Sequence, residues 1–231
     1  MGGGTYLQEY DRSFKLTYPY SGKNELKIAL MSDLHIGSPN ADILFKKTID
    51  DMNMLGVSYS FVIGDLVGSG DVQYATEEFF DTYITIRNTS ILAREKWVEV
   101  AGNHDKDKGG ESLSIFLDKL GYESATYTKT FDNITVIAMG CTYGNVNEVK
   151  FLSSELNWME ENIQSNQDKN IFLLVHAPKY STTWKSTESS YYALPKDDMN
   201  LLLSNNRIDA YFHGHVHIDE SIQFNGIESY E

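Results

Sequence analysis

The sequence predicts an α/β fold, in which helices cover a largely parallel sheet or a pair of sheets. Short apolar runs alternate along the chain with amphipathic segments, which is the pattern of strands that alternate with helices. The apolar runs contain few polar residues, and this favours strands that are buried on both faces. The chain has 231 residues, of which 41% are hydrophobic, and no linker or internal repeat divides it. We therefore expect one sizeable core.

Six apolar runs are the predicted strands. Most of them are short and rich in β-branched or aromatic residues, which fit a pleated and buried surface. They span residues 26–32, 59–64, 97–102, 134–140, 171–177 and 209–214. Residues 221–231 predict a further strand, a turn and the start of another strand.

The amphipathic segments between these runs are the predicted helices. In residues 40–55 the apolar side chains form one stripe, and Gly56 ends the helix. Ser153 or Ser154 can cap the helix that carries Leu156, Met159 and Ile163, and Pro195 suits the first position of a helix with Met199, Leu202 and Leu203. Residues 76–92 and 112–120 are the other predicted helices, and residues 105–111 and 178–194 are predicted loops.

Composition excludes several classes of protein. The net charge of −14 repels nucleic-acid phosphates, and no run of lysines or arginines reverses it, so we expect no non-specific nucleic-acid binding. No apolar run approaches the roughly 18 residues of a membrane span, so we expect no membrane partner. The single cysteine, Cys141, cannot form an internal disulfide, and no signal peptide begins the chain. We therefore expect a cytoplasmic protein.

Polar side chains follow five of the predicted strands, at the edge where ligands gather in open α/β sheets. All six histidines of the chain are among them. A glycine precedes Asp65, Asn103 and His215, which lets the backbone turn tightly and approach a ligand. Carboxylate, imidazole and amide oxygen favour a divalent ion such as Mn, Fe, Zn, Ni or Co, and the lack of thiolates argues against a structural zinc site. The residues are Asp33, His35, Asp65, Asn103, His104, Asp105, His176, His213, His215 and His217.

These blocks occur in an order that resembles a known family. The order D-x-H, G-D, G-N-H-D, H and G-H-x-H, from Asp33 to His217, is similar to the signature of the calcineurin-like metallophosphoesterases. The resemblance implies a four-layer α/β/β/α sandwich, with two mixed sheets flanked by helices. It also implies a two-metal site at the C-terminal ends of the strands.

Carried over to this chain, the resemblance assigns a role to each residue. Asp65 would bridge two divalent metal ions. His104 would protonate the leaving oxygen as general acid, and Asp105 would orient His104. Asp33, His35 and His217 would bind one ion, and Asn103, His176 and His215 would bind the other.

The implied function is a metal-dependent phosphoesterase that acts on a small molecule or nucleotide. A hydroxide that bridges the two ions would attack the phosphoester, with phosphodiesters favoured. A phosphomonoesterase or nuclease of the same superfamily and a non-catalytic scaffold are the alternatives. The acidic charge argues against a nuclease, and the complete set of predicted ligands together with His104 argues against a scaffold. The arginine of the protein-phosphatase branch has no counterpart in this chain.

Four further predictions concern the edges of the site and of the domain. His213 either packs beside the site or contacts substrate or metal. Tyr180, Trp184 and Tyr191, in the loop 178–194, either pack locally or form a lid over the substrate. We expect residues 1–25 to be an N-terminal extension that could add a strand, and residues 26–231 to be the metallophosphoesterase domain. The short segment after His217 would also suit a domain cut from a longer protein with a further C-terminal domain.

Overall fold

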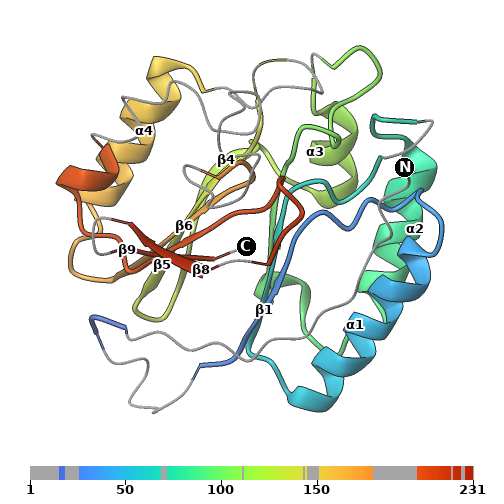
Figure 1. Ribbon diagram of the computed structural model, residues 1–231, viewed down its shortest axis with the longest axis horizontal. Coiled ribbons are helices and arrows are strands. Elements are labelled where there is room, and N and C mark those ends of the chain that lie inside the picture. The colour runs from blue at the N-terminus through green and yellow to red at the C-terminus, as the bar shows by residue number, and fades with distance from the viewer. Residues whose placement is uncertain are drawn as a thin grey trace.

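The structure is a computed structural model in which two sheets are packed between two layers of helices (Figure 1). Helices α1, α2 and α3 cover one sheet, and α4 covers the other, on the opposite side of the molecule. This is the four-layer α/β/β/α arrangement that the sequence resemblance implies. The structure describes residues 16–18, 26–68, 72–110, 112–142, 144, 151–178, 202–219, 221–224 and 227–230.

The first sheet holds three parallel strands in the order β1-β2-β3. Ile28 pairs with Tyr59, and Ser60 pairs with Trp97, so the carboxyl ends of the strands lie at one edge. The described strands of this sheet are all parallel, whereas the expectation was a mixed sheet. The strands are β1 (Ile28–Met31), β2 (Tyr59–Ile63) and β3 (Trp97–Val100).

The second sheet holds six strands in the order β4-β5-β6-β7-β9-β8 and is mixed. The pairs β4–β5 and β8–β9 are antiparallel, and the central pairs are parallel. The apolar runs do not predict β4, because its sequence TYTKTF is polar and its residues alternate between half-buried and exposed from Tyr127 to Thr130. The strands are β4 (Thr126–Phe131), β5 (Ile134–Met139), β6 (Asn170–Val175), β7 (Ala210–Phe212), β8 (Ser221–Phe224) and β9 (Ile227–Tyr230).

The helices begin within two residues of the predicted starts, but α2 ends at Arg87, five residues before the predicted end. Helix α1 buries Phe45 and Ile49, and Gly56 ends it in the left-handed region with its N–H bonded to the Met52 carbonyl at 3.1 Å. Helix α4 begins after Leu152, whose N–H donates to Glu155 at 2.7 Å, so neither predicted serine is the cap. The elements are α1 (Ala41–Leu55), α2 (Glu77–Arg87), the 3₁₀ turn η1 (Arg94–Lys96), α3 (Ser114–Leu120) and α4 (Ser153–Gln164), with residues 202–205 also helical.

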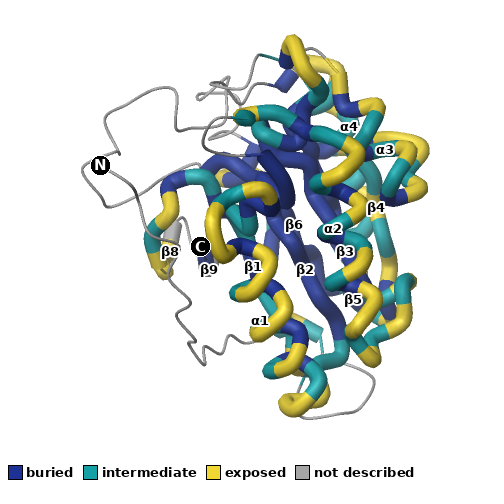
Figure 2. Tube along the Cα trace, turned by 90° about the vertical axis from the view of Figure 1, so that its right-hand side faces the viewer, coloured by how far each residue is buried: buried dark blue, intermediate teal, exposed yellow. Residues whose placement is uncertain are grey.

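Three apolar clusters separate the four layers. One lies between α1–α3 and the first sheet, and another lies between α4 and the second sheet. The cluster between the sheets is aromatic: Phe61 of β2 meets the rings of Phe172 and Phe212 edge-on, with centroids 6.3 and 6.0 Å apart. Figure 2 shows β2 and β6 buried in the interior, with the exposed residues on the outer faces of the helices. This packing brings the carboxyl ends of both sheets to one side.

Part of the predicted N-terminal extension contacts the second sheet. Thr17 N–H donates to Asp209 at 3.1 Å, Tyr18 N–H donates to Asn170 at 2.8 Å, and Leu16 packs into the cluster between the sheets. These contacts join the extension to the start of β6 and to the residue before β7. Across the described residues, no helix has the length and apolar character needed to cross a membrane. The lid residues Tyr180, Trp184 and Tyr191, and the predicted helix start at Pro195, lie outside the described residues.

Candidate metal centre

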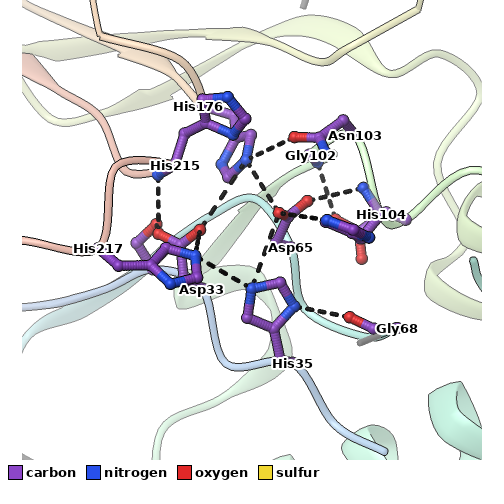
Figure 3. Close-up of polar contacts among 12 residues, drawn as sticks. Asp33, His35, Asp65, Gly68, Gly102, Asn103, His104, His176, His215 and His217 are labelled. Atoms are coloured by element: carbon purple, nitrogen blue, oxygen red, sulfur yellow. Dashed lines mark hydrogen bonds and ion pairs between the residues drawn. The ribbon is translucent and has the colours of Figure 1, made fainter. Parts of the chain in front are cut away.

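The predicted site residues converge from both sheets (Figure 3). They follow the carboxyl ends of β1, β2 and β3 in the first sheet and of β6 and β7 in the second. Asp33, His35 and His217 place one ligand atom each within 4.8 Å of one another, and so do Asp65, His176 and His215. The structure therefore brings together the groups expected from the sequence, from five segments that are far apart in the chain.

Asp65 lies between the two groups. Its Oδ2 is 3.2 Å from His176 Nε2 in its own group and 3.9 Å from His35 Nε2 in the other. Asn103 lies beside the group of Asp65, His176 and His215, because its Oδ1 is 3.1 Å from His176 Nε2. Asp65 is 1% exposed and Asn103 is 2% exposed, so both are removed from water. This position suits a carboxylate that contacts two ions at once.

Backbone carbonyls orient two of the histidines. His35 Nδ1 donates to the Gly68 carbonyl at 2.6 Å, and His176 Nδ1 donates to the Ile63 carbonyl at 2.9 Å. With Nδ1 as the donor, the Nε2 lone pair of each neutral ring faces the centre. His35 Nε2 also lies 3.2 Å from His217 Nε2. Nitrogen lone pairs that face one another at this distance require a proton or a cation between them.

Asp33 carries an unsatisfied buried oxygen. Its Oδ2 accepts the His215 N–H at 2.9 Å and the Ser32 hydroxyl. Its Oδ1 is buried and has no hydrogen-bond partner among the described residues, and the nearest ring nitrogen is His217 Nε2 at 3.2 Å. Most buried polar atoms in proteins are hydrogen-bonded, so an exception of this kind calls for an explanation. A metal ion at this oxygen supplies one.

The backbone of the predicted ligands is strained. A positive φ is uncommon for residues other than glycine, and each such residue costs about 1–3 kcal/mol unless its surroundings hold it. Hydrogen bonds hold two of them: Asp33 N–H donates to the Gly64 carbonyl at 3.0 Å, and His35 N–H to the Asp65 carbonyl at 2.9 Å. Among the described residues, seven other than glycine have a positive φ, and five of them are the predicted ligands Asp33, His35, Asp65, His215 and His217.

Two of the predicted glycines permit a close approach. A Cβ at Gly102 would overlap the carboxylate and backbone of Asp65, and a Cβ at Gly214 would overlap Ser32 and Asp33. Gly102 thus lies against the carboxylate of Asp65, and Gly214 lies against that of Asp33. Any larger residue would push Asp65 or Asp33 out of the centre.

The electrostatics of these residues favour cations. Burial raises the pKa of Asp65, but the charge and hydrogen bond of His176 outweigh it, and the pKa lies well below its usual range. Burial also raises the pKa of Asp33, and here His217 and His176 lower it overall. Burial lowers the pKa of His176, whereas Asp65 and Asp33 raise it to about 10. Without metal, a proton on His176 therefore neutralises part of the carboxylate charge, and a metal ion would displace that proton. The donor set, its charge and the unsatisfied Asp33 oxygen together fit divalent metal ions.

His104 lies at the exposed side of the centre. Its N–H donates to Asp65 at 2.8 Å, its Nε2 is 4.0 Å from the other oxygen of Asp65, and its side chain is 20% exposed. The backbone carbonyl of Gln73 holds its Nδ1 at 3.0 Å. No side-chain pattern could reveal this partner, because any residue offers the same carbonyl. The Gly68 and Ile63 carbonyls escape sequence reasoning for the same reason.

Asp105 supports the loops instead of the His104 ring. It is fully buried, and its two oxygens accept the Gly102 N–H at 2.8 Å and the Val67 N–H at 3.1 Å. Burial and then the charge of Asp65 raise its pKa to about 7. The expectation that Asp105 orients His104 therefore changes: Asp105 joins the loop that carries His104 to the loop after β2, and Gln73 contacts the ring.

His213 lies apart from the two ligand groups. It is fully buried, its N–H donates to the Tyr230 carbonyl at 2.9 Å, and its Nε2 is 3.0 Å from Ser229 Oγ. Both partners belong to β9. Of the two roles weighed from the sequence, these contacts favour packing between β7 and β9.

Comparison with known proteins identifies the family. A sequence model described as calcineurin-like phosphoesterase matches residues 26–219. The chain belongs to this family. As a calcineurin-like phosphoesterase it is a hydrolase acting on phosphoester bonds, and its Asp and His groups suit a dinuclear divalent metal site. No curated protein matched the sequence of this phosphoesterase.

Solved structures share the fold of this phosphoesterase at low sequence identity. A dimetal phosphatase from Danio rerio is 11% identical, with 89% of this chain and 86% of the other covered and a TM-score of 0.69. The phosphopantetheinyl hydrolase of Mycobacterium tuberculosis is 14% identical, with 90% and 88% covered and a TM-score of 0.54. The anchor in the inner membrane complex of Plasmodium is 15% identical, with 89% and 70% covered and a TM-score of 0.58.

Proposed function

We propose that this phosphoesterase hydrolyses its substrate with two divalent metal ions held at the junction of the two sheets. The observation that carries the proposal is the pair of ligand groups linked by Asp65, together with the unsatisfied Oδ1 of Asp33. One ion would be held by Asp33, His35 and His217, the other by Asn103, His176 and His215, and Asp65 would contact both.

When bound, the two ions would lower the pKa of water to about 7, which supplies hydroxide at neutral pH, and would neutralise the phosphoryl oxygens. The chain supplies the remaining steps. His104 gives its Nε2 proton to the leaving oxygen as the bond from phosphorus to that oxygen breaks and the bond to the attacking oxygen forms. The Gln73 carbonyl keeps the other ring proton on Nδ1, which directs Nε2 toward the centre. The products are the free alcohol and, from a diester, a phosphate monoester, or, from a monoester, inorganic phosphate.

The metal and the substrate class follow from the chemistry of the donors and from the charge of the chain. Imidazole, carboxylate and amide oxygen suit Mn, Fe, Zn, Ni or Co. A net charge of −14 disfavours a nucleic-acid substrate, so we propose a small-molecule or nucleotide phosphoester. We propose phosphodiesters before monoesters because of the range of reactions in the family, and no residue of this chain distinguishes the two.

A scaffold without activity is the second candidate, since a protein with this fold is named as an anchor. A scaffold would not require the ligand residues to keep a metal-binding geometry. The strained backbone at five predicted ligands and the two glycines against Asp65 and Asp33 instead favour a working centre.

The test is reconstitution of the metal-free protein, followed by elemental analysis and turnover. We expect two equivalents of metal after incubation with Mn, and hydrolysis of bis-(4-nitrophenyl) phosphate or of 4-nitrophenyl phosphate. Cyclic nucleotides and single-stranded DNA complete the panel. Less than one equivalent of bound metal would contradict the proposed mechanism. Two equivalents without turnover of any ester would favour the scaffold.

A further inference from the structure

Two loops run side by side along the exposed side of the metal centre. His104 Nδ1 donates to the Gln73 carbonyl at 3.0 Å, and two residues further along each loop the Ala75 N–H donates to the Lys106 carbonyl at 2.7 Å. Tyr74 lies between these two contacts. The chain at Tyr74 is therefore held directly against the segment that carries the proposed general acid.

Gly68 ties the same region to the predicted ligands. A Cβ at Gly68 would lie 3.0 Å from the His104 carbonyl oxygen and 3.2 Å from Tyr74 N, so the three backbones are in contact. The Gly68 carbonyl also holds His35 at 2.6 Å. Tyr74 thus lies next to the residue that orients a predicted ligand.

Lys108 adds a positive charge to this rim. Its Nζ lies 5.9 Å from the centre of the half-buried Tyr74 ring, and Lys108 is itself exposed. No carboxylate among the described residues forms an ion pair with it, whereas Lys47 and Lys119 on the helices are paired with Asp51 and Asp81 at 2.7 Å. In a chain with a net charge of −14, Lys108 is thus a positive charge beside Tyr74 that no described carboxylate neutralises.

The loop that carries Lys108 is ordered before any ligand arrives. Asp107 accepts the Ser114 N–H at 3.0 Å and the Ile115 N–H at 3.1 Å, and its carbonyl accepts the Gly110 N–H at 2.8 Å. A charge on a preorganised loop loses little conformational entropy on binding. Lys108 is therefore in a position to select among ligands.

We propose that Lys108, positioned by Tyr74, binds a negatively charged group on the leaving alcohol of the substrate. This proposal rests on the proposed function. His104 gives its proton to the leaving oxygen, so the leaving group departs on the His104 side, where Tyr74 lies beside the His104 loop and Lys108 lies beside the Tyr74 ring. The preferred substrates are phosphoesters whose leaving alcohol carries a second anion, and uncharged leaving alcohols are poorer substrates.

The experiment compares aryl phosphates that differ by one carboxylate. Phenyl and 4-carboxyphenyl phosphate, each as monoester and as methyl diester, are assayed with the Mn-loaded protein. The readout is the ratio of kcat/KM for the carboxylated ester to that for the plain ester, which cancels effects common to both. We expect Lys108→Met to lower this ratio about fivefold, the effect of an exposed ion pair near the upper end of its range. Lys108→Glu should lower it further, and added salt should reduce the wild-type ratio.

Matched variants separate the contact from general charge. Lys47→Met removes the same charge from the surface of α1 and should leave the ratio unchanged. Tyr74→Phe keeps the ring and should keep the ratio, whereas Tyr74→Leu should lower it. An unchanged ratio in Lys108→Met, with both esters hydrolysed, would overturn the inference alone. If the wild type binds two equivalents of metal and hydrolyses neither ester, the proposed function fails, and the inference fails with it.

Discussion

Glu99 within the first sheet and the two aspartates after its strands are carboxylates that are stabilised in opposite ways. Glu99, within β3, is fully buried. Its Oε1 accepts from Arg87 at 2.8 Å and from the Tyr83 hydroxyl at 3.0 Å, and its Oε2 accepts from the Tyr122 hydroxyl and pairs with Arg94, both at 2.8 Å. Burial and then the charge of Glu99 raise the pKa of Tyr122 to about 12, so the phenol keeps its proton. Two arginines, which are always charged, and two tyrosine hydroxyls, which keep their protons, satisfy this carboxylate.

The carboxylates of the metal centre have no such partners. Oδ1 of Asp33 has no hydrogen bond among the described residues, and the ion-pair partners of Asp33 and Asp65 are histidines, whose protons a metal ion can displace. The backbone at both aspartates lies in the left-handed region. A buried carboxylate with fixed cations is structural, whereas one that depends on histidines and keeps an unsatisfied oxygen indicates a place for a cation. Each prediction below tests this distinction.

The largest effect is expected from Asp65→Ala, because Asp65 is the carboxylate proposed to contact both ions. We expect loss of at least one equivalent of metal and a fall in turnover of about 10³-fold or more. Elemental analysis and a nitrophenyl ester assay measure the two. Asp81→Ala, on the exposed face of α2, is the control. A variant that keeps both ions and its activity would contradict the proposed role of Asp65 as a metal ligand.

His104→Ala should separate chemistry from metal binding. The ring lies at the edge of the centre and is held by Gln73, so its loss removes a proton donor but no predicted ligand. We expect two bound equivalents of metal and a fall in kcat of about 10²–10⁴-fold, the usual contribution of general acid catalysis. An ester with a leaving group of low pKa needs less protonation and should lose less. Equal losses for all leaving groups would argue against the general acid role.

Glu99→Ala tests the structural carboxylate. It leaves the buried Arg87 without its partner, which costs about 3–5 kcal/mol of unfolding free energy. Urea unfolding measures this, with Glu95→Ala as the exposed control. Metal content per folded protein should stay at the wild-type value. If folded Glu99→Ala loses metal, the two carboxylate groups are coupled and the comparison fails.

Metal removal tests the aspartates of the metal centre, and its expected effect on stability is the smallest of the four. An ion that binds only the folded state stabilises it by about 2.7 kcal/mol at a hundredfold excess over its Kd. We expect Mn to raise the Tm of the metal-free wild type and of Glu99→Gln alike. Asp33→Asn should reduce the rise, because the amide cannot supply the second anionic oxygen. A wild-type Tm that does not respond to metal would contradict the metal centre.

Sequence reasoning succeeded where the signal is local and failed where it depends on neighbours. The strand ends are readable because an apolar run followed by Asp33 or His176 needs no tertiary information. Strand β4 gives no such local signal, because its polar residues form a strand only by pairing with β5, from Thr126 opposite Met139 to Phe131 opposite Ile134. The ion pairs of Glu99 with Arg87 and Arg94 give no local signal either, because an acidic residue within an apolar run does not indicate which cations will pair with it.

By itself, the sequence determined the alternation of strands and helices and the chemical types that follow each strand, because both depend on residues adjacent in the chain. Only the tertiary structure decided which ligands share a group and which oxygen of Asp33 stays unsatisfied. It also decided that main-chain carbonyls, rather than side chains, hold His35, His104 and His176. The physical reason is that every residue carries the same carbonyl, so its role depends on where the fold places it and not on the amino acid that bears it.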